Sequence, residues 1–217
     1  MMRKIFPILL VFAACLTTYA QQYTFVFLNN KKDKAVLPKE EVDKIMEGHM
    51  ANINRLAKEE KLVCAGPFEG GGGLFIFRSG SKKEVEEWLS TDPGVKAQRW
   101  NIEILPYTPR VGSVCAVKEP YEMTMYNFVR YEINISKDTF SDLPEAIKEH
   151  DQYLKKLASA NSDVVTEAVF GTNEGGILVL KGELNNALID QDPSVQKQVI
   201  TATIKKLYIA KGAFCEK

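Results

Sequence analysis

The chain has two histidines, and each is followed along the sequence by an Asp-Pro pair and then by a cysteine. The spacing from His to Asp is 43 residues in the first half and 42 in the second, and the spacing from Asp to Cys is 23 in both. The sequence therefore contains an internal repeat of about 100 residues, the length of a small domain. Its members are His49, Asp92-Pro93 and Cys115 in the first half and His150, Asp192-Pro193 and Cys215 in the second.

A histidine and an aspartate can act together in acid–base catalysis. Imidazole titrates near pH ~6.5, and a carboxylate that accepts its ring N–H fixes the tautomer and raises its basicity. His49 with Asp92, and His150 with Asp192, are therefore candidate catalytic pairs. The alternative is structural: a core histidine on an apolar helix face, and an aspartate before proline that bonds nearby backbone. Packing alone would tolerate Leu or Met in place of His, so the recurrence of the pair in two divergent copies favours function.

Hydrophobic periodicity in the first half predicts the order strand, helix, strand, strand, helix, strand. The first helix carries an apolar stripe with spacings of 4, 3, 4 and 3, and His49 lies in its middle. The second helix begins at Ser81 and ends at Asp92-Pro93. The predicted strands span 23–28, 62–68, 74–77 and 100–106, and the first helix starts at Pro38 and includes the stripe Val42, Met46, His49, Ile53 and Leu56.

The second half repeats this order, with His150 in a stripe of identical spacing. Its second helix, 184–189, is shorter and weaker. Its predicted strands span 126–133, 164–170, 177–180 and 199–209, and the stripe is Leu143, Ile147, His150, Leu154 and Leu157. We therefore predict an α+β fold of two tandem ferredoxin-like βαββαβ units, with domains over 21–116 and 126–217 and a linker over 117–125.

Both faces of each predicted sheet need to be covered. Tyr23, Phe25 and Phe27 alternate along the first strand, while Val26 and Leu28 point to the opposite face. Helices can cover only one of these faces, so the second copy is expected to cover the other. The result would be an intramolecular pseudo-dimer, a dimeric α+β barrel, in a chain that is a monomer or a higher homo-oligomer.

Three motifs of the first half resemble the YciI-like (YCII-related) family. They are a helical His49 followed by Leu56, an Ala65-Gly66-Pro67 sequence at the end of the second strand, and the turn Asp92-Pro93-Gly94-Val95-Lys96-Ala97. They occur in the family's order and cover most of residues 23–115. The second half resembles a degenerate copy, because Ala168-Val169 stands where Gly66-Pro67 would be expected.

The resemblance implies a shallow pocket for a small molecule of unknown identity, with the His and Asp as catalytic residues and Gly66, Pro67 and Pro93 as substrate-binding residues. It also implies that the first copy, which keeps every motif, is the active one. At least one relative eliminates chloride from a chlorinated aromatic, but nothing in this sequence transfers that substrate here.

The N-terminus is typical of a secretory signal. Arg3 and Lys4 precede an apolar stretch, and Thr18-Tyr19-Ala20 offers small residues for cleavage before Gln21. We therefore expect residues 1–20 to be removed and the protein to be exported, periplasmic or secreted. The alternative is a lipoprotein, in which Cys15 would carry the lipid.

Three cysteines remain after that cleavage: Cys64, Cys115 and Cys215. Equivalent positions in two halves related by a pseudo-twofold axis can meet near the axis, so Cys115 and Cys215 could form a disulfide. The alternative is that they lie far apart at the ends of the two domains. Cys64 could present a thiol to the pocket, but a buried small hydrophobic residue is the preferred interpretation.

Composition excludes several classes of partner. The chain has 28 basic and 28 acidic residues, and no basic tract indicates a nucleic-acid partner. No later stretch is apolar over the ~20 residues that a transmembrane helix needs. The glycines of 70–73 lack the Lys of a phosphate loop, and two histidines in separate lobes make a poor metal site, so no cofactor and no metal are expected.

Two functions remain. The first is cofactor-independent acid–base chemistry, such as elimination, isomerisation or a lyase reaction on a small organic molecule, with His49 as base or acid and Asp92 orienting it. The second is a non-catalytic binding or structural module that keeps the fold. Catalysis requires the His and Asp side chains within hydrogen-bond reach beside a common cavity.

Overall fold

A computed structural model describes residues 22–135 and 143–215, so the predicted signal and Cys15 lie outside the described residues. Among these residues, no helix is both long enough and apolar enough to cross a membrane. Both halves contain the predicted order of strands and helices. The first consists of β1 (Tyr23–Asn30), α1 (Lys39–Lys58), β2 (Leu62–Pro67), β3 (Gly73–Phe77), α2 (Lys82–Leu89), α3 (Pro93–Lys96) and β4 (Trp100–Val111). The second consists of β6 (Met123–Ile133), α4 (Leu143–Ala160), β7 (Val164–Phe170), β8 (Gly176–Leu180), α5 (Ala187–Asp190), α6 (Pro193–Gln196) and β9 (Ile200–Ala210).

Several boundaries differ from the prediction. β6 begins at Met123, inside the predicted linker 117–125. The helix that begins after its N-cap Ser81 ends at Leu89, and Asp92 starts a separate short helix, α3. The second helix of the second half is the single turn α5, shorter than the predicted 184–189. β4 continues to Val111, beyond the predicted end near Pro106, because its second part pairs with β7 of the other half.

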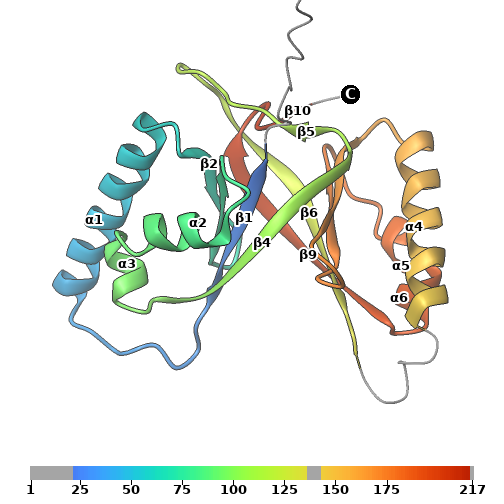
Figure 1. Ribbon diagram of the computed structural model, residues 1–217, viewed down its shortest axis with the longest axis horizontal. Helices are drawn as coiled ribbons and strands as arrows, with labels where there is room; N and C mark the ends of the chain where they lie inside the picture. The colour runs from blue at the N-terminus through green and yellow to red at the C-terminus, as the bar shows by residue number, and fades with distance from the viewer. Residues whose placement is uncertain (1–21, 136–142, 216–217) are drawn as a thin grey trace, which may run out of the picture.

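The strands form one eight-stranded antiparallel sheet in the order β2-β3-β1-β4-β7-β8-β6-β9. Figure 1 shows the helices of each half on the outside and the strands between them, with β4 and β9 crossing in the middle. The halves join where β4 pairs with β7, and β9 returns to β2 through the bridge between Phe68 and Leu207. The fold is therefore α+β, with two ferredoxin-like units forming an intramolecular barrel.

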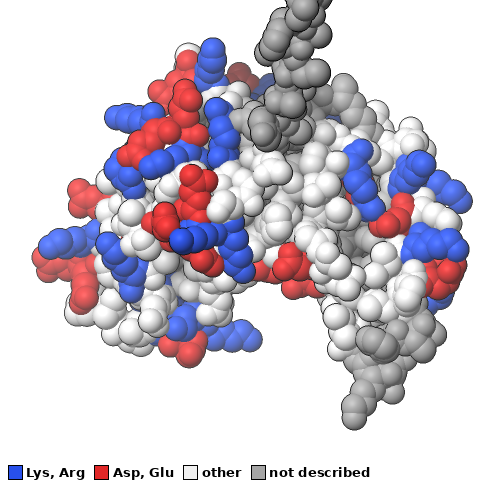
Figure 2. Space-filling view, viewed as in Figure 1, with Lys and Arg blue, Asp and Glu red and all other residues white. Residues whose placement is uncertain are grey.

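The cores confirm that each sheet is covered on both faces. Tyr23, Phe25 and Phe27 of β1 belong to a central cluster that both halves share. Val26 and Leu28 belong to the cluster between the first sheet and its helices. A corresponding cluster in the second half lies under α4. On the outside, Figure 2 shows basic and acidic side chains interspersed over the α1 and α2 region.

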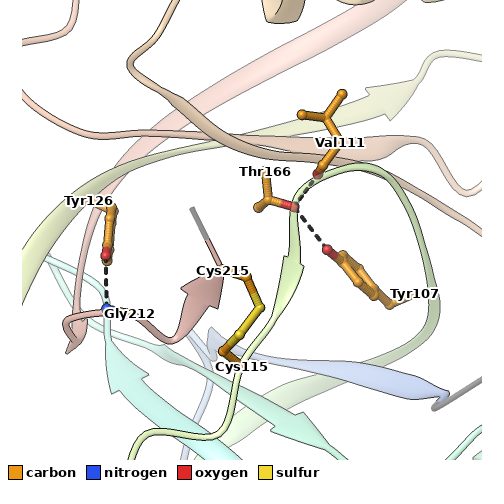
Figure 3. Close-up of a disulfide and its surroundings, with 7 residues drawn as sticks. All are labelled: Tyr107, Val111, Cys115, Tyr126, Thr166, Gly212 and Cys215. Atoms are coloured by element: carbon orange, nitrogen blue, oxygen red, sulfur yellow. Dashed lines mark hydrogen bonds between the residues drawn. A yellow bond between two sulfur atoms is a disulfide. The ribbon is translucent and has the colours of Figure 1, made fainter. Parts of the chain in front are cut away.

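Cys115 and Cys215 are joined by a disulfide, with Cα atoms 5.3 Å apart. Next to it, β5 (Ser113–Val114) pairs with β10 (Phe214–Cys215), so the ends of the two halves meet (Figure 3). The interpretation that placed these cysteines far apart is therefore wrong. The bridge closes a loop with a sequence separation of 100 residues and fastens the two halves at equivalent positions.

We predict that reduction of this disulfide lowers the free energy of unfolding by roughly 2–5 kcal/mol, because the unfolded chain regains the entropy of a long loop. Urea unfolding of the mature protein with and without dithiothreitol measures the difference. The double variant Cys115→Ser/Cys215→Ser is the control and should not respond to the reductant. Equal stability of oxidised and reduced wild type would contradict the prediction.

Candidate functional site

The first His–Asp pair is formed and buried. His49 projects from α1 and Asp92 precedes α3, and their Nδ1 and Oδ2 atoms are 2.8 Å apart. The two oxygens of Asp92 have different partners. Oδ1 accepts the backbone N–H groups of Gly94 and Val95 at the start of α3, whereas Oδ2 accepts from His49 and from Asn52. The turn-forming role and the histidine-orienting role of Asp92 therefore coexist in one carboxylate.

The second pair repeats this geometry with fewer partners. The Nδ1 atom of His150 lies 2.6 Å from Oδ2 of Asp192, and Oδ1 of Asp192 accepts the N–H of Ser194. Asp192 is fully buried, as is Asp92. Tyr153, one helical turn after His150, bonds to the carbonyl of Leu188. The sequence prediction that each histidine meets its own aspartate is therefore met in both halves.

Electrostatics fix the roles within the first pair. Burial would raise the pKa of Asp92, but the hydrogen bond and charge of His49, with bonds from Val95 and Asn52, outweigh burial and hold the pKa below its ordinary value. Asp92 is therefore ionised near neutral pH. Since a carboxylate has no proton to donate, Nδ1 of His49 carries the proton. The second ring nitrogen, Nε2, is then the one that could exchange a proton with another molecule.

The two histidine rings have different surroundings. His49 packs against Trp100 and Phe75, with ring centroids 4.8 and 5.7 Å away. The strand registers place Ile200 and Leu178 at the equivalent positions in the second half. These side chains are smaller, and the aromatic neighbour of His150 is instead Tyr131, whose ring is edge-on at 4.7 Å.

A cavity of about 210 Å³ lies beside His150. His150, Tyr131 and Ile200 form part of its wall, together with glycines at the turn between β7 and β8. The second pair therefore meets both criteria for catalysis, hydrogen-bond contact and a neighbouring cavity. The sequence motifs favoured the first copy.

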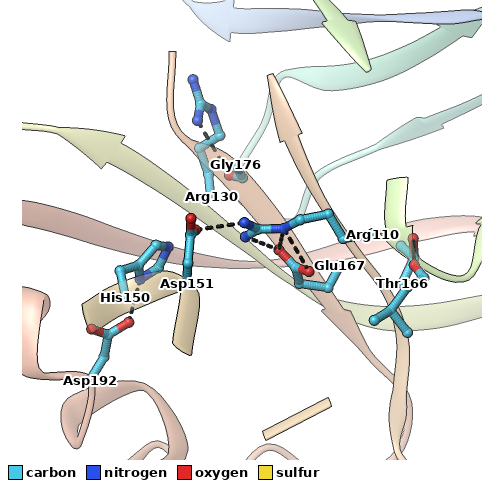
Figure 4. Close-up of polar contacts among 9 residues, drawn as sticks. Arg110, Arg130, His150, Asp151, Thr166, Glu167, Gly176 and Asp192 are labelled. Carbon is cyan, nitrogen blue, oxygen red and sulfur yellow. Dashed lines mark hydrogen bonds and ion pairs between the residues drawn. The ribbon is translucent and has the colours of Figure 1, made fainter. Parts of the chain in front are cut away.

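An ion cluster also borders this cavity, and it draws on both halves. Arg110, at the end of β4, binds Glu167 of β7 through Nε, with distances of 2.9 and 3.0 Å to the two carboxylate oxygens. Its NH1 group binds Asp151 of α4 at 2.6 Å. Figure 4 shows Arg110 between these two acids, with the His150–Asp192 pair beyond Asp151. Every charge of the cluster therefore has a partner of opposite sign.

Four residues of the cavity and its ion cluster were not predicted from the sequence: Arg110, Tyr131, Asp151 and Glu167. The surroundings of His49 have no such cluster: the strand registers and the position after the histidine place Ala210, Leu28, Met50 and Ala65 at the equivalent positions. The signal was present in the sequence, because aligning the halves shows four polar residues replacing apolar ones around one histidine only.

Residues predicted to bind substrate have structural explanations. A Cβ on Gly66 would lie 2.3 Å from the carbonyl oxygen of Tyr208, so glycine is required where β2 approaches β9. Pro93 begins α3 and packs against Gly48 of α1, where a Cβ would lie 2.9 Å from the proline ring. A substrate-binding role of Gly66, Pro67 and Pro93 stays a prediction.

The remaining chemical candidates lie away from either pair. Cys64 is a free, half-buried thiol that packs against the central core, and burial raises its pKa to about 12. This agrees with the small hydrophobic role preferred from the sequence. Within residues 22–135 and 143–215, no group of three or more His, Cys, Asp or Glu side chains is arranged to hold a metal ion.

A family model matches part of the chain. Residues 23–108 match the model of the YCII-related domain. The match spans β1 to β4 and includes both members of the His49–Asp92 pair. The resemblance drawn from the sequence motifs is thereby confirmed for the first half.

Several solved structures resemble the chain at low sequence identity. A proposed monooxygenase from Lactobacillus acidophilus NCFM has a TM-score of 0.43 and 9% identity, covering 92% of this chain and 100% of that one. A proposed chlorite dismutase has a TM-score of 0.43 and 10% identity, covering 89% and 96%. A siroheme decarboxylase has a TM-score of 0.43 and 5% identity, covering 85% and 70%. No curated protein matches the sequence at a significant level.

We predict that Asp92→Asn lowers the free energy of unfolding by roughly 1–3 kcal/mol at pH 7, because the amide can still cap α3 but cannot accept from His49 as a charged group. The contribution of ionised Asp92 is present above its unfolded-state pKa of ~3.9 and is lost as the pH falls through the lower folded-state pKa. The difference between the variant and wild type should therefore shrink below about pH 4.

Urea unfolding followed by circular dichroism at neutral and acidic pH measures this difference. Asp43→Asn is the matched control, because Asp43 is exposed and pairs with Lys39 on the surface of α1. Its effect should stay within about 0.5 kcal/mol. If the loss of unfolding free energy in Asp92→Asn stayed constant or grew on acidification, the role of the ionised carboxylate would be refuted.

Proposed function

We propose that the second half of this protein carries out cofactor-independent acid–base chemistry on a small organic molecule, with His150 as the catalytic acid or base. One observation carries the proposal: His150 is held by Asp192 at 2.6 Å and at the same time lines a cavity of about 210 Å³. The elimination, isomerisation and lyase reactions considered for this chain all need a proton to be taken from or given to the substrate.

The division of work between the two residues follows from their contacts. Asp192 accepts a hydrogen bond from Nδ1–H of His150, which fixes the orientation and tautomer of the ring and turns Nε2 to the task of proton exchange. Asp192 is buried and its other oxygen binds the N–H of Ser194, so it serves as a positioning residue. Proton transfer to or from the substrate is assigned to His150 alone.

The first pair is proposed to support the structure. The rings of Phe75 and Trp100 pack against His49, and its aspartate receives four hydrogen bonds. Such a histidine contributes to the packing between α1 and the sheet. His49 therefore provides a matched reference for His150 within the same molecule.

We further propose that the protein is exported. The disulfide between Cys115 and Cys215 supports this, because such bonds form and persist in oxidising compartments such as the periplasm or the cell exterior. The predicted signal at residues 1–20 agrees with that location.

Hydrogen exchange tests the catalytic proposal before any substrate is known. The mature protein is incubated in D₂O with a panel of small carbonyl compounds, and deuterium incorporation at carbon is followed by NMR. We expect exchange in at least one compound, and His150→Asn should slow it by roughly 10²–10⁴-fold. Asparagine can still donate to Asp192 through Nδ2, but it has no group equivalent to Nε2.

His49→Asn is the matched control and should leave the exchange rate unchanged. Equal loss in both variants, or exchange that His150→Asn does not slow, would assign the chemistry elsewhere. Absence of exchange across the panel, with ligands still binding, would favour the alternative of a binding module.

A further inference from the structure

Tyr131, a residue of the wall of the cavity beside His150, carries a buried polar group that is not hydrogen-bonded within the part of the chain that the structure describes. Tyr131 is fully buried and lines the cavity, and its hydroxyl has no hydrogen-bond partner among the residues that the structure describes. An unpaired buried hydroxyl destabilises the folded protein. By contrast, the buried hydroxyl of Tyr107 in the barrel core lies 2.9 Å from that of Thr166.

The Tyr131 hydroxyl is suited to donate a hydrogen bond. Burial, together with the nearby Asp192, Tyr153 and Glu167, raises the pKa of Tyr131 well above its ordinary value, so it keeps its proton at neutral pH. Its ring lies edge-on to His150. A ligand atom that accepted this proton would therefore be close to the ring of the proposed catalytic residue.

The charged groups around the cavity already have partners. Arg110 binds both Glu167 and Asp151, and Asp192 binds His150. A carboxylate or phosphate ligand would have to displace one of these acids from Arg110. A cationic ligand would have to compete with Arg110 for the same acids. Neither sign of charge has an unused counter-charge in this cluster.

Most of the remaining wall is apolar, and the cavity has the size of a small ring compound. Cavities of roughly 150 Å³ are large enough to hold benzene, and this one is about 210 Å³. The apolar side chains come from β6, β7, β9 and α4, and they include Ile133, Ile147, Leu154, Val169, Phe170 and Ile200.

We propose that this cavity binds an uncharged, largely apolar molecule, such as a substituted benzene, through a single oxygen acceptor that receives the hydroxyl proton of Tyr131. This names the substrate class of the proposed site and so rests on the proposed function. Tyr131 would select ligands with an acceptor and place that acceptor beside His150. In an aryl ketone, the hydrogen bond would also polarise the carbonyl whose neighbouring C–H proton His150 could remove.

Three probes of equal heavy-atom count test the class: acetophenone, which is neutral with one acceptor, cumene, which has none, and benzoate, which is anionic. Affinities are measured by isothermal titration calorimetry and ligand-observed NMR on the mature protein. We expect acetophenone to bind best. Tyr131→Phe should weaken acetophenone roughly fivefold to tenfold and leave the affinity for cumene unchanged.

If the Tyr131 hydroxyl served only the structure, Tyr131→Phe would lower the unfolding temperature. Because the hydroxyl is unpaired, we expect the variant instead to keep or raise the unfolding temperature without added ligand, and to weaken the binding of acetophenone. Tyr107→Phe is the matched control: it should lower the unfolding temperature, because it removes the bond to Thr166, and leave acetophenone affinity unchanged.

The inference is overturned if no probe binds, if benzoate binds as tightly as acetophenone, or if Tyr131→Phe weakens cumene as much as acetophenone. These failures are separate from failure of the catalytic proposal. Acetophenone binding that depends on Tyr131, without deuterium exchange in the D₂O panel, would remove catalysis and keep the ligand class. Exchange that depends on His150 but occurs only with anionic compounds would keep the catalytic proposal and remove the proposed ligand class.

Discussion

Each half of this chain builds a four-stranded sheet with two apolar faces, and the whole molecule follows from the need to cover both. Helices cover the outer face, and only another sheet of similar size can cover the inner one. β4 therefore extends past its own sheet to pair with β7. That extension carries Arg110 to Glu167 and Asp151, so the cavity in the second half depends on a strand of the first. The pairing of β4 with β7 therefore both closes the barrel and completes the cavity wall.

Within each half, one buried carboxylate joins helix, turn and histidine. Asp92 and Asp192 each use Oδ1 for the N-terminus of a short helix and Oδ2 for the ring of the histidine. A buried charge is tolerated only when it is fully hydrogen-bonded, and the helix N-terminus supplies N–H donors for it. The Asp-Pro sequence suits this arrangement because proline at the first helical position has no N–H to leave unpaired. A structural role and a positioning role therefore use different atoms of one side chain.

The fold and both His–Asp contacts could be predicted from the sequence because they depend on local, repeated signals. The stripes around His49 and His150 have helical period, and the alternation of Tyr23, Phe25 and Phe27 specifies a strand with an inner face. The disulfide could be proposed but not decided, since it depends on where two chain ends meet in space. The ion cluster of Arg110 could not be found in this way, because its members come from β4, α4 and β7. Their proximity follows only from the pairing of β4 with β7 across the two halves.

The turn after Asp92 explains why the cavity described above lies beside His150, although the first copy keeps more of the family's motifs. Gly94 of the first copy leaves room for Trp100, since a Cβ there would lie 2.5 Å from the indole ring, and Trp100 packs on His49. In the second copy Ser194 and Ile200 replace these two residues, and the serine hydroxyl bonds instead to the carbonyl of Ala146. Loss of the indole removes an aromatic neighbour of the histidine, and Ile200 becomes part of the cavity wall. The glycine of the turn thus accompanies a histidine that packs against an indole, and its loss in the degenerate copy accompanies a buried histidine that lines the cavity.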